Sequence, residues 1–217
     1  MRLAGIIDHT ILKPDCSMDE IKRLCAEAVK YEFKAVCIPP FYIKEAAQLL
    51  EKAPVKVAGV IGFPMGYSAT AAKVEEIKRA INDGADELDV VINICAVKSG
   101  NWNYVRNDID SMTLATHSRG KVIKVIIETG LLSTDEIKKL CGMCSQAGVD
   151  FVKTSTGFNA AGANVETVEF LRANLPASIK IKASGGIRSV QDAERLVAAG
   201  ADRLGSSAGV QIVSSAG

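Results

Sequence analysis

The sequence predicts one (β/α)8 TIM barrel spanning residues 1–217, and three observations support this α/β fold class. Eight short segments rich in Val and Ile alternate with longer amphipathic segments. Several short segments are almost continuously apolar, as parallel strands covered on both faces require. The tripeptide Gly-Ala-Asp at 84–86 and 200–202, with Gly-Val-Asp at 148–150, marks a repeating helix-to-strand unit. No linker divides the chain, and counting strands leaves a doubly wound open sheet as the alternative.

The expected strands are residues 5–10, 35–38, 55–61, 87–92, 121–128, 149–153, 179–183 and 202–205. Three helices between them should begin at a serine followed three positions later by an acidic residue, because such pairs satisfy the first free amides. These pairs are Ser17 with Glu20, Ser133 with Glu136, and Ser189 with Asp192. The Ala-rich segment before Gly200 is expected to be a helix that this glycine ends.

Composition excludes several classes of function. Hydrophobic residues make up 48% and charged residues 24%, so the chain can bury a globular core. A formal net charge of +1 gives no field for holding nucleic acid or an anionic membrane, so we expect neither partner. Asp8 and His9 interrupt the first apolar stretch, so we expect no signal peptide or membrane span, and a cytoplasmic location.

Six cysteines lie without regular spacing, and a chain of this length does not need disulfides, so reduced thiols are expected. Only Cys141 and Cys144 form a CxxC pair, with no second pair or nearby histidine to complete a zinc site. We expect a structural role for this pair, with a redox or metal role as the alternative.

Polar residues gather where the expected strands end, and barrel active sites lie at the carboxyl ends of strands. The candidate site residues are Asp8, Thr10, Cys37, Asp89, Asn93, Glu128, Lys153 and Lys182. Because strand side chains alternate between faces, Asp8 and Thr10 should share one side, as should Glu87, Asp89 and Asn93.

Two lysines on neighbouring strands indicate a chemical role. A lone Lys153 would be costly if buried unpaired, so the plainer hypothesis is that it reaches solvent or pairs with a carboxylate. With Lys182 beside it, charge repulsion and partial burial would both lower the pKa of Lys153. A neutral amine can attack a carbonyl to form a Schiff base, and Asp89 can carry protons, directly or through water.

Two turns containing glycine and serine predict a phosphate site. ASGGIR at 183–188 follows the expected seventh strand, and GSSAG at 205–209 follows the eighth. Backbone amides and helix amino termini after these two strands commonly bind phosphate in barrels. The loop STGFN at 155–159 can add an amide beside Lys153.

Eight segments together resemble one known family in order and placement. They are IDHTILK (7–13), AVCIP (35–39), GFPMG (62–66), ELDVVIN (87–93), KVIIET (124–129), FVKTSTGF (151–158), KASGGIR (182–188) and GSS (205–207). The family is deoxyribose-phosphate aldolase, a class I aldolase, and the resemblance covers nearly the full length. The segments around Lys153 and Lys182 are the most specific.

The resemblance implies reversible cleavage of 2-deoxy-D-ribose 5-phosphate to acetaldehyde and D-glyceraldehyde 3-phosphate, in deoxyribose phosphate catabolism, without metal or cofactor. It implies that Lys153 forms the Schiff base while Lys182 and Asp89 handle its protons. It also implies a homodimer or homotetramer. The residues expected to bind substrate are Asp8, Thr10, Cys37 and Asn93, and those expected to bind phosphate are Gly157, Gly185, Gly186, Ser206 and Ser207.

Two departures from the family pattern bear on this assignment. Some members carry a lysine where this chain has Phe158, so one possible phosphate cation is missing. Some members end in a tyrosine, whereas the last tyrosine here is Tyr104, so help from a terminal tyrosine in proton transfer is not expected.

Two other hypotheses stay open. Another Schiff-base barrel, such as a transaldolase-like or hexose-phosphate lyase, would keep the central lysine but not the paired Lys182 within KASGG. A non-catalytic phosphosugar-binding barrel would need the two turns but would have no use for two inward lysines.

Overall fold

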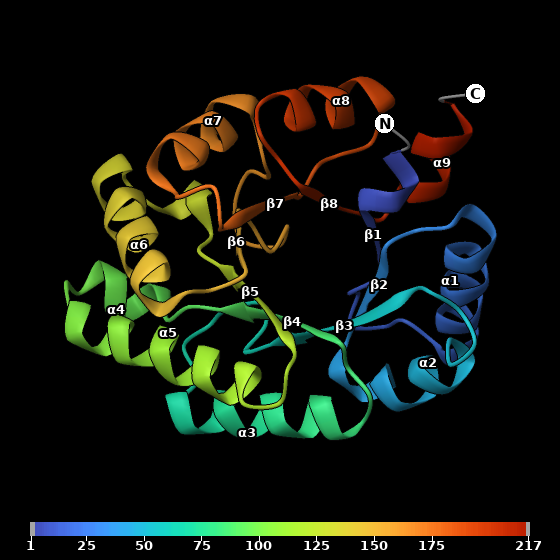
Figure 1. The fold of residues 1–217 in the computed structure, drawn as a ribbon, viewed down its shortest axis with the longest axis horizontal. Helices are drawn as coiled ribbons and strands as arrows, with labels where there is room; N and C mark the ends of the chain where they lie inside the picture. Colours follow the sequence, from blue (N-terminus) through green and yellow to red (C-terminus); the bar gives the residue numbers. More distant parts are fainter. Residues whose placement is uncertain (1–2, 216–217) are drawn as a thin grey trace.

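The computed structural model describes residues 3–215, which form a closed barrel of eight parallel strands in the order β1 to β8. The strands lie in a ring with helices around the outside (Figure 1). This arrangement confirms the predicted fold class and excludes the doubly wound open sheet. The strands are β1 (Ile7–Thr10), β2 (Ala35–Ile38), β3 (Lys56–Ile61), β4 (Glu87–Val91), β5 (Val122–Ile126), β6 (Phe151–Lys153), β7 (Lys180–Ser184) and β8 (Arg203–Ser206).

Helices cover the outer face of the barrel (Figure 1). They are α1 (Met18–Tyr31), α2 (Ile43–Leu49), α3 (Thr70–Asn82), α4 (Ile94–Lys98), α5 (Trp102–His117), α6 (Thr134–Ala147), α7 (Val165–Asn174), α8 (Val190–Ala198) and α9 (Gly209–Ser214), with 3-10 helices η1 (Leu3–Ile6), η2 (Pro40–Tyr42) and η3 (Thr129–Leu131). Both η1 and α9 pack beside β1, so the two ends of the described chain lie close together. Within residues 3–215, no helix is long and apolar enough to cross a membrane.

The predicted helix starts are confirmed at Ser17 and Ser133. Each hydroxyl accepts from the amide three residues on, at 3.4 Å for Ser17 and 3.2 Å for Ser133, and the acidic partner accepts the serine amide at 2.7 Å. At Ser189 the hydroxyl accepts from the Asp192 amide at 3.1 Å and donates to the Asp192 carboxylate at 2.7 Å. Amides that have no partner inside the helix are satisfied in this way.

The aspartate of each Gly-Ala-Asp or Gly-Val-Asp unit ties two neighbouring strands together. Asp86, Asp150 and Asp202 precede β4, β6 and β8, and each carboxylate accepts a backbone N–H from the strand before it. The donors are Val57 at 3.2 Å, Ile123 at 2.8 Å and Ile181 at 2.8 Å. The repeat therefore fixes strand pairs near their amino-terminal ends, away from the edge where barrel sites lie.

The barrel interior is filled largely by charged side chains. Barrels usually fill this space with Val, Ile and Leu. Here Asp89, Lys124 and Lys182 are fully buried inside it, and a small apolar cluster around Cys37 occupies the side of β2 and β3. The main hydrophobic core lies between the strands and the helices, so it stabilises the fold while the interior is left for other groups.

The strand boundaries differ from the predicted ones at several ends. Residues 3–6 form η1 instead of the start of β1, and β8 runs one residue further, to Ser206. β5 ends at Ile126 because Glu128 adopts a left-handed backbone conformation with φ of 54°, which a strand cannot contain. The end of the sequence, to which the expectation about a terminal tyrosine refers, lies partly outside the described residues.

Candidate active site

Asp89 lies at the centre of the barrel and joins three lysines. Its Oδ2 accepts from Lys153 Nζ on β6 and from Lys182 Nζ on β7, both at 2.7 Å, and its Oδ1 accepts from Lys124 Nζ on β5 at 2.8 Å. Strand register explains the meeting, because Lys153 pairs with Lys182 and Asp89 with Lys124 across neighbouring strands. The structure thus brings the three predicted catalytic residues together around one carboxylate.

The charges around Asp89 fix the protonation states of this cluster. Burial alone would raise the pKa of Asp89, but Lys124, Lys153 and Lys182 outweigh it and hold that pKa well below its usual value. Burial would lower the pKa of Lys182, but Asp8 and Asp89 raise it above its ordinary value. The site therefore holds an ionised carboxylate beside a lysine that stays protonated. The neutral amine expected at Lys153 stays a prediction.

The ionic network continues from these lysines toward the amino-terminal end of the barrel. Asp8 accepts from the Lys182 amine through Oδ2 and from Arg203 Nη1 through Oδ1 at 2.7 Å. Glu87 lies 2.5 Å from Lys124 Nζ and accepts from Arg203 Nη1 at 3.1 Å. Each of these charged groups at the amino-terminal end of the barrel therefore has an opposite charge in contact with it.

Asp8 belongs to this network and not to the wall of a cavity. Burial raises its pKa, but Lys182, Lys124 and Arg203 outweigh burial and lower the pKa to about 2. Thr10, two residues on, donates from its hydroxyl to the Asp8 carbonyl at 2.8 Å and does line a cavity. Both carboxylate oxygens of Asp8 are bound to buried cations, and its expected role in substrate binding stays a prediction.

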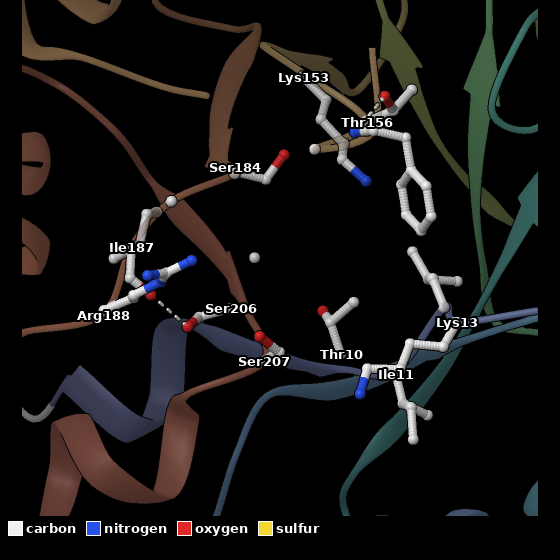
Figure 2. Close-up of a pocket in the computed structure, with 16 residues that line it drawn as sticks. Thr10, Ile11, Lys13, Lys153, Thr156, Ser184, Ile187, Arg188, Ser206 and Ser207 are labelled. Carbon is white, nitrogen blue, oxygen red and sulfur yellow. Dashed lines mark hydrogen bonds between the residues drawn. The ribbon is translucent and has the colours of Figure 1, made fainter. Parts of the chain in front are cut away.

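A cavity of about 270 Å³ opens at the carboxyl ends of the strands, with Lys153 in its wall. Figure 2 shows the Lys153 amine pointing into this cavity, with Arg188 and Ser206 on the opposite side. All five predicted phosphate residues line it, namely Gly157, Gly185, Gly186, Ser206 and Ser207. The candidate nucleophile and the candidate phosphate turns therefore face one space.

Close packing around this cavity explains three glycines. Gly185 has φ of 89°, and a Cβ there would lie 2.8 Å from the Cα of Gly162. A Cβ on Gly162 would lie 2.0 Å from the Gly185 carbonyl oxygen. On β8, a Cβ at Gly205 would lie 3.1 Å from Lys182 Cε, so glycine leaves room for the lysine to reach Asp8 and Asp89.

Serine hydroxyls tie the two turns to each other and to the loop after β6. Ser206 Oγ donates to the Ile187 carbonyl at 2.7 Å and accepts from the Ala208 amide at 3.0 Å. Ser184 Oγ donates to the Ser155 carbonyl at 2.7 Å. Ser206 therefore holds the turns in position, while the exposed Ser207 faces the cavity.

Glu128 fixes the loop that follows Lys153. Its buried carboxylate accepts from the Thr156 amide at 3.1 Å, from the Thr156 hydroxyl, and from Asn159 Nδ2 at 3.1 Å. Asn159 Nδ2 also donates to the Pro64 carbonyl at 3.1 Å, which links this loop to the one after β3. These bonds hold Gly157 against the cavity without contact between Glu128 and the ionic network.

Two further predicted substrate residues differ in placement. Cys37 is buried beside Asp89, with Sγ 3.8 Å from Oδ2, and burial raises the pKa of this thiol, so it stays neutral. Asn93 caps α4, where its Oδ1 accepts from the Ala96 amide at 3.0 Å. The cap uses only Oδ1 of Asn93, and its expected substrate contact stays a prediction.

Sequence reasoning missed four cations of the site. Lys13 and Arg188 are exposed and line the cavity, so positive charge is present although Phe158 replaces a lysine there. Lys124 and Arg203 were missed inside the barrel. A signal for Lys124 was present, because a lysine within the strand VIKVI that faced the apolar helices would be buried unpaired.

The CxxC pair has the features of core residues. Cys141 and Cys144 are buried on α6, and burial raises the pKa of Cys141 to about 11. Among residues 3–215, no group of three or more His, Cys, Asp or Glu side chains is arranged to hold a metal ion. These observations favour packing as the role of the pair.

Comparisons with known proteins agree on one family. The family described as DeoC/LacD family aldolase matches residues 3–215. The deoxyribose-phosphate aldolase of Thermococcus gammatolerans is 48% identical over 100% of this chain and 97% of its own length. The deoxyribose-phosphate aldolase of Desulfitobacterium hafniense strain DCB-2 is 52% identical over 98% of each chain.

Solved structures agree with the sequence relatives. A putative deoxyribose-phosphate aldolase from Coccidioides immitis superposes with a TM-score of 0.95 at 44% identity, over 99% of this chain and 85% of that one. The deoxyribose phosphate aldolase from Aeropyrum pernix, described as having a unique tetrameric structure, gives 0.92 at 36% identity, over 98% and 90%.

The low pKa of Asp8 predicts a pH dependence of stability. A carboxylate whose pKa is depressed to about 2 contributes stability above its unfolded pKa near 4, and this is lost as pH falls toward 2. The difference in unfolding free energy between wild type and Asp8→Asn should therefore shrink by about 2 kcal/mol over that range. Urea unfolding at several pH values measures it. Asp19→Asn, at an exposed carboxylate, should follow wild type, and a constant difference for Asp8→Asn would contradict the prediction.

Proposed function

Because the chain belongs to the DeoC/LacD family of aldolases, we propose that it is a class I aldolase acting on 2-deoxy-D-ribose 5-phosphate. The reaction is reversible carbon–carbon cleavage to acetaldehyde and D-glyceraldehyde 3-phosphate. The observation that supports this most is the Lys153 amine, 2.7 Å from Asp89, in the wall of a cavity that the two phosphate turns also line.

In the cleavage direction, the Lys153 amine attacks C1 of the open-chain sugar, and loss of water leaves an iminium ion. Removal of the proton from the C3 hydroxyl then breaks the C2–C3 bond and releases glyceraldehyde 3-phosphate. The electron pair of that bond forms an enamine on Lys153. Protonation of the enamine carbon and hydrolysis by water release acetaldehyde and return the free amine.

Asp89 and Lys182 are placed to move the protons of this sequence. Asp89 accepts a hydrogen bond from Lys153 Nζ, so it lies where protons leave and return to that nitrogen. While three cations surround it, its lowered pKa keeps it ionised. At the enamine stage Lys153 carries no charge, so Asp89 holds a proton more readily, and Lys182 can donate one through the same oxygen.

The substrate phosphate is proposed to lie at the turns after β7 and β8. The backbone there is open at Gly185 and Gly186, and Ser207 adds an exposed hydroxyl. Arg188 lines the same part of the cavity and supplies a guanidinium suited to a phosphate. This arrangement replaces the charge that a lysine at Phe158 would have given.

The other hypotheses explain less of the site. A non-catalytic phosphosugar-binding barrel has no need to bury Lys153 and Lys182 on one oxygen of Asp89. Burying these charged groups carries a desolvation penalty, and simple sugar binding gives no reason for it. A different Schiff-base lyase lacks a reason for the KASGG segment, which places Lys182 on β7 and a candidate phosphate turn directly after that strand. Homodimeric or homotetrameric assembly and a cytoplasmic location stay predictions.

Covalent trapping tests the proposed nucleophile. Incubation with acetaldehyde and borohydride should add an ethyl group to the peptide that carries Lys153, because borohydride reduces the imine to a stable amine. Peptide mass mapping detects it. Lys153→Ala should lose both the label and aldol cleavage, whereas Lys180→Ala, at the exposed lysine of the neighbouring strand, should keep both. A label confined to other lysines would show that the mechanism is wrong.

Kinetics with two substrates test the phosphate site. Arg188→Leu should raise the KM for 2-deoxyribose 5-phosphate by about tenfold, since a charge-assisted contact of that kind contributes on the order of 1.5 kcal/mol. Cleavage of unphosphorylated 2-deoxyribose should not change. Arg195→Leu, at an exposed arginine of α8 outside this cavity, is the matched control. Equal losses with both substrates would contradict a phosphate role for Arg188.

A further inference from the structure

Seven ionisable side chains form one buried network inside the barrel. Its members are the cations Lys124, Lys153, Lys182 and Arg203 and the carboxylates Asp8, Glu87 and Asp89. Four positive and three negative charges leave one positive charge in excess when every group is ionised. Because a buried net charge is unfavourable, the network favours the loss of one proton.

The contacts indicate which cation gives up that proton. Lys124 lies within 3.9 Å of three carboxylates, and Lys182 and Arg203 each contact two. Among the described residues Lys153 contacts a single carboxylate, Asp89, through an oxygen that Lys182 also occupies. Lys153 also lines the cavity, so water and substrate can reach it. Lys153 is therefore the cation of the network with the fewest carboxylates in contact with it.

We propose that Glu87 and Arg203 are positioning residues that set the pH at which Lys153 becomes a nucleophile. Both lie in the buried network at the amino-terminal end of the barrel, and neither lines the cavity that contains Lys153. The inference rests on the proposed Schiff-base role of Lys153 and goes beyond it, because it assigns a role in the reaction to groups that do not meet substrate.

Arg203 and Glu87 reach the nucleophile through separate contacts. Arg203 Nη1 occupies Asp8 Oδ1 at 2.7 Å, which leaves Asp8 Oδ2 for Lys182. Glu87 lies 2.5 Å from Lys124 Nζ, and this amine donates to Asp89 Oδ1, the oxygen that Lys153 and Lys182 do not contact. Each residue thus adds one charge to the network. Arg203 also positions Lys182 through Asp8, and Glu87 positions Lys124 directly.

The buried Phe151 ring packs against this end of the network. The Arg203 guanidinium lies 5.3 Å over the Phe151 ring, and Lys180 lies 5.7 Å from the same ring. Because Glu87 and Arg203 are buried, the local dielectric is low and a charge at either residue acts strongly on the others. Screening by salt is weak for such buried groups.

Charged and titratable groups face Lys153 from every strand around it except β3, which contributes Ala58 and Val60, and the loop cations Lys13 and Arg188 line the same cavity. Cys37 on β2 is a neutral thiol because burial raises its pKa. Glu128, after β5, binds Thr156 and Asn159, which are uncharged. The others are Asp8 on β1, Glu87 and Asp89 on β4, Lys124 on β5, Lys182 on β7 and Arg203 on β8.

The opposite charges of the two residues give the test its sign. Glu87→Gln removes a negative charge, so the Lys153 ammonium is less stable and the acid limb of kcat/KM for 2-deoxyribose 5-phosphate should move to lower pH. Arg203→Met removes a positive charge, so the limb should move to higher pH. Glu87 keeps Lys124 as its partner in that variant. We expect about one pH unit each way, as for a unit charge roughly 10 Å away at an effective dielectric of about 20.

The double variant Glu87→Gln with Arg203→Met should return the limb to its wild-type position. The charge-conserving variants Glu87→Asp and Arg203→Lys should leave it there. Glu75→Gln and Lys78→Met, which break an exposed pair on α3, control for overall net charge and should not move the limb. Thermal unfolding checks that each variant is folded.

Shifts of both single variants in the same direction, or unmoved limbs with a reduced kcat, would overturn the proposal. If one single variant does not fold, the other still has its own expected sign. If neither folds, a displaced limb in the double variant would overturn the proposal, and an unmoved limb there would support it. Failure of the proposed function is a separate result, since it appears as a wild-type enzyme without a borohydride adduct on Lys153.

Discussion

One oxygen of Asp89 accepts hydrogen bonds from both Lys153 and Lys182, and the rest of the interior depends on this contact. Two ammonium groups buried side by side without it would cost on the order of several kcal/mol each. Lys124 donates to the other oxygen of the Asp89 carboxylate, and Lys182 also donates to Asp8. The interior therefore stabilises a set of charges that an apolar barrel would exclude.

Stability and chemistry occupy different parts of the molecule. The hydrophobic core lies outside the strands, and the aspartates of the Gly-Ala-Asp and Gly-Val-Asp units tie strand pairs at their amino-terminal ends. These features leave the interior free to hold charged groups and the carboxyl edge free to form loops. Glu128 then fixes the loop after Lys153, and Ser206 fixes the turns after β7 and β8, so the cavity is preorganised on both sides.

The sequence predicted most of this arrangement because strand periodicity and turn chemistry are local. All eight strands, the serine caps and the glycine turns follow from short segments. The position of a side chain along the barrel axis cannot be predicted in this way, because strand alternation gives the face on which a side chain lies but not the side chains that it contacts. The expectation that Asp8 and Asn93 bind substrate thus gave no sign that Asp8 binds buried cations or that Asn93 caps α4, and substrate contact at either residue stays a prediction. Arg203 was missed because its partner Asp8 lies on β1, which meets β8 only when the barrel closes. Lys124 was missed although its partner Asp89 lies on the adjacent strand β4.

Hydrogen exchange on the donor aldehyde tests the central claim most directly, because an enamine on Lys153 must exchange the methyl hydrogens of acetaldehyde with solvent even when no acceptor is present. Acetaldehyde and the protein in D2O, followed by proton NMR, give the rate. Loss of the methyl signal in wild type, little loss with Lys182→Leu and none with Lys153→Ala is the result expected if Lys153 forms the enamine and Lys182 helps to keep its amine neutral. A wild-type protein that leaves the methyl signal unchanged, or a Lys153→Ala protein that exchanges it as fast, would contradict this account.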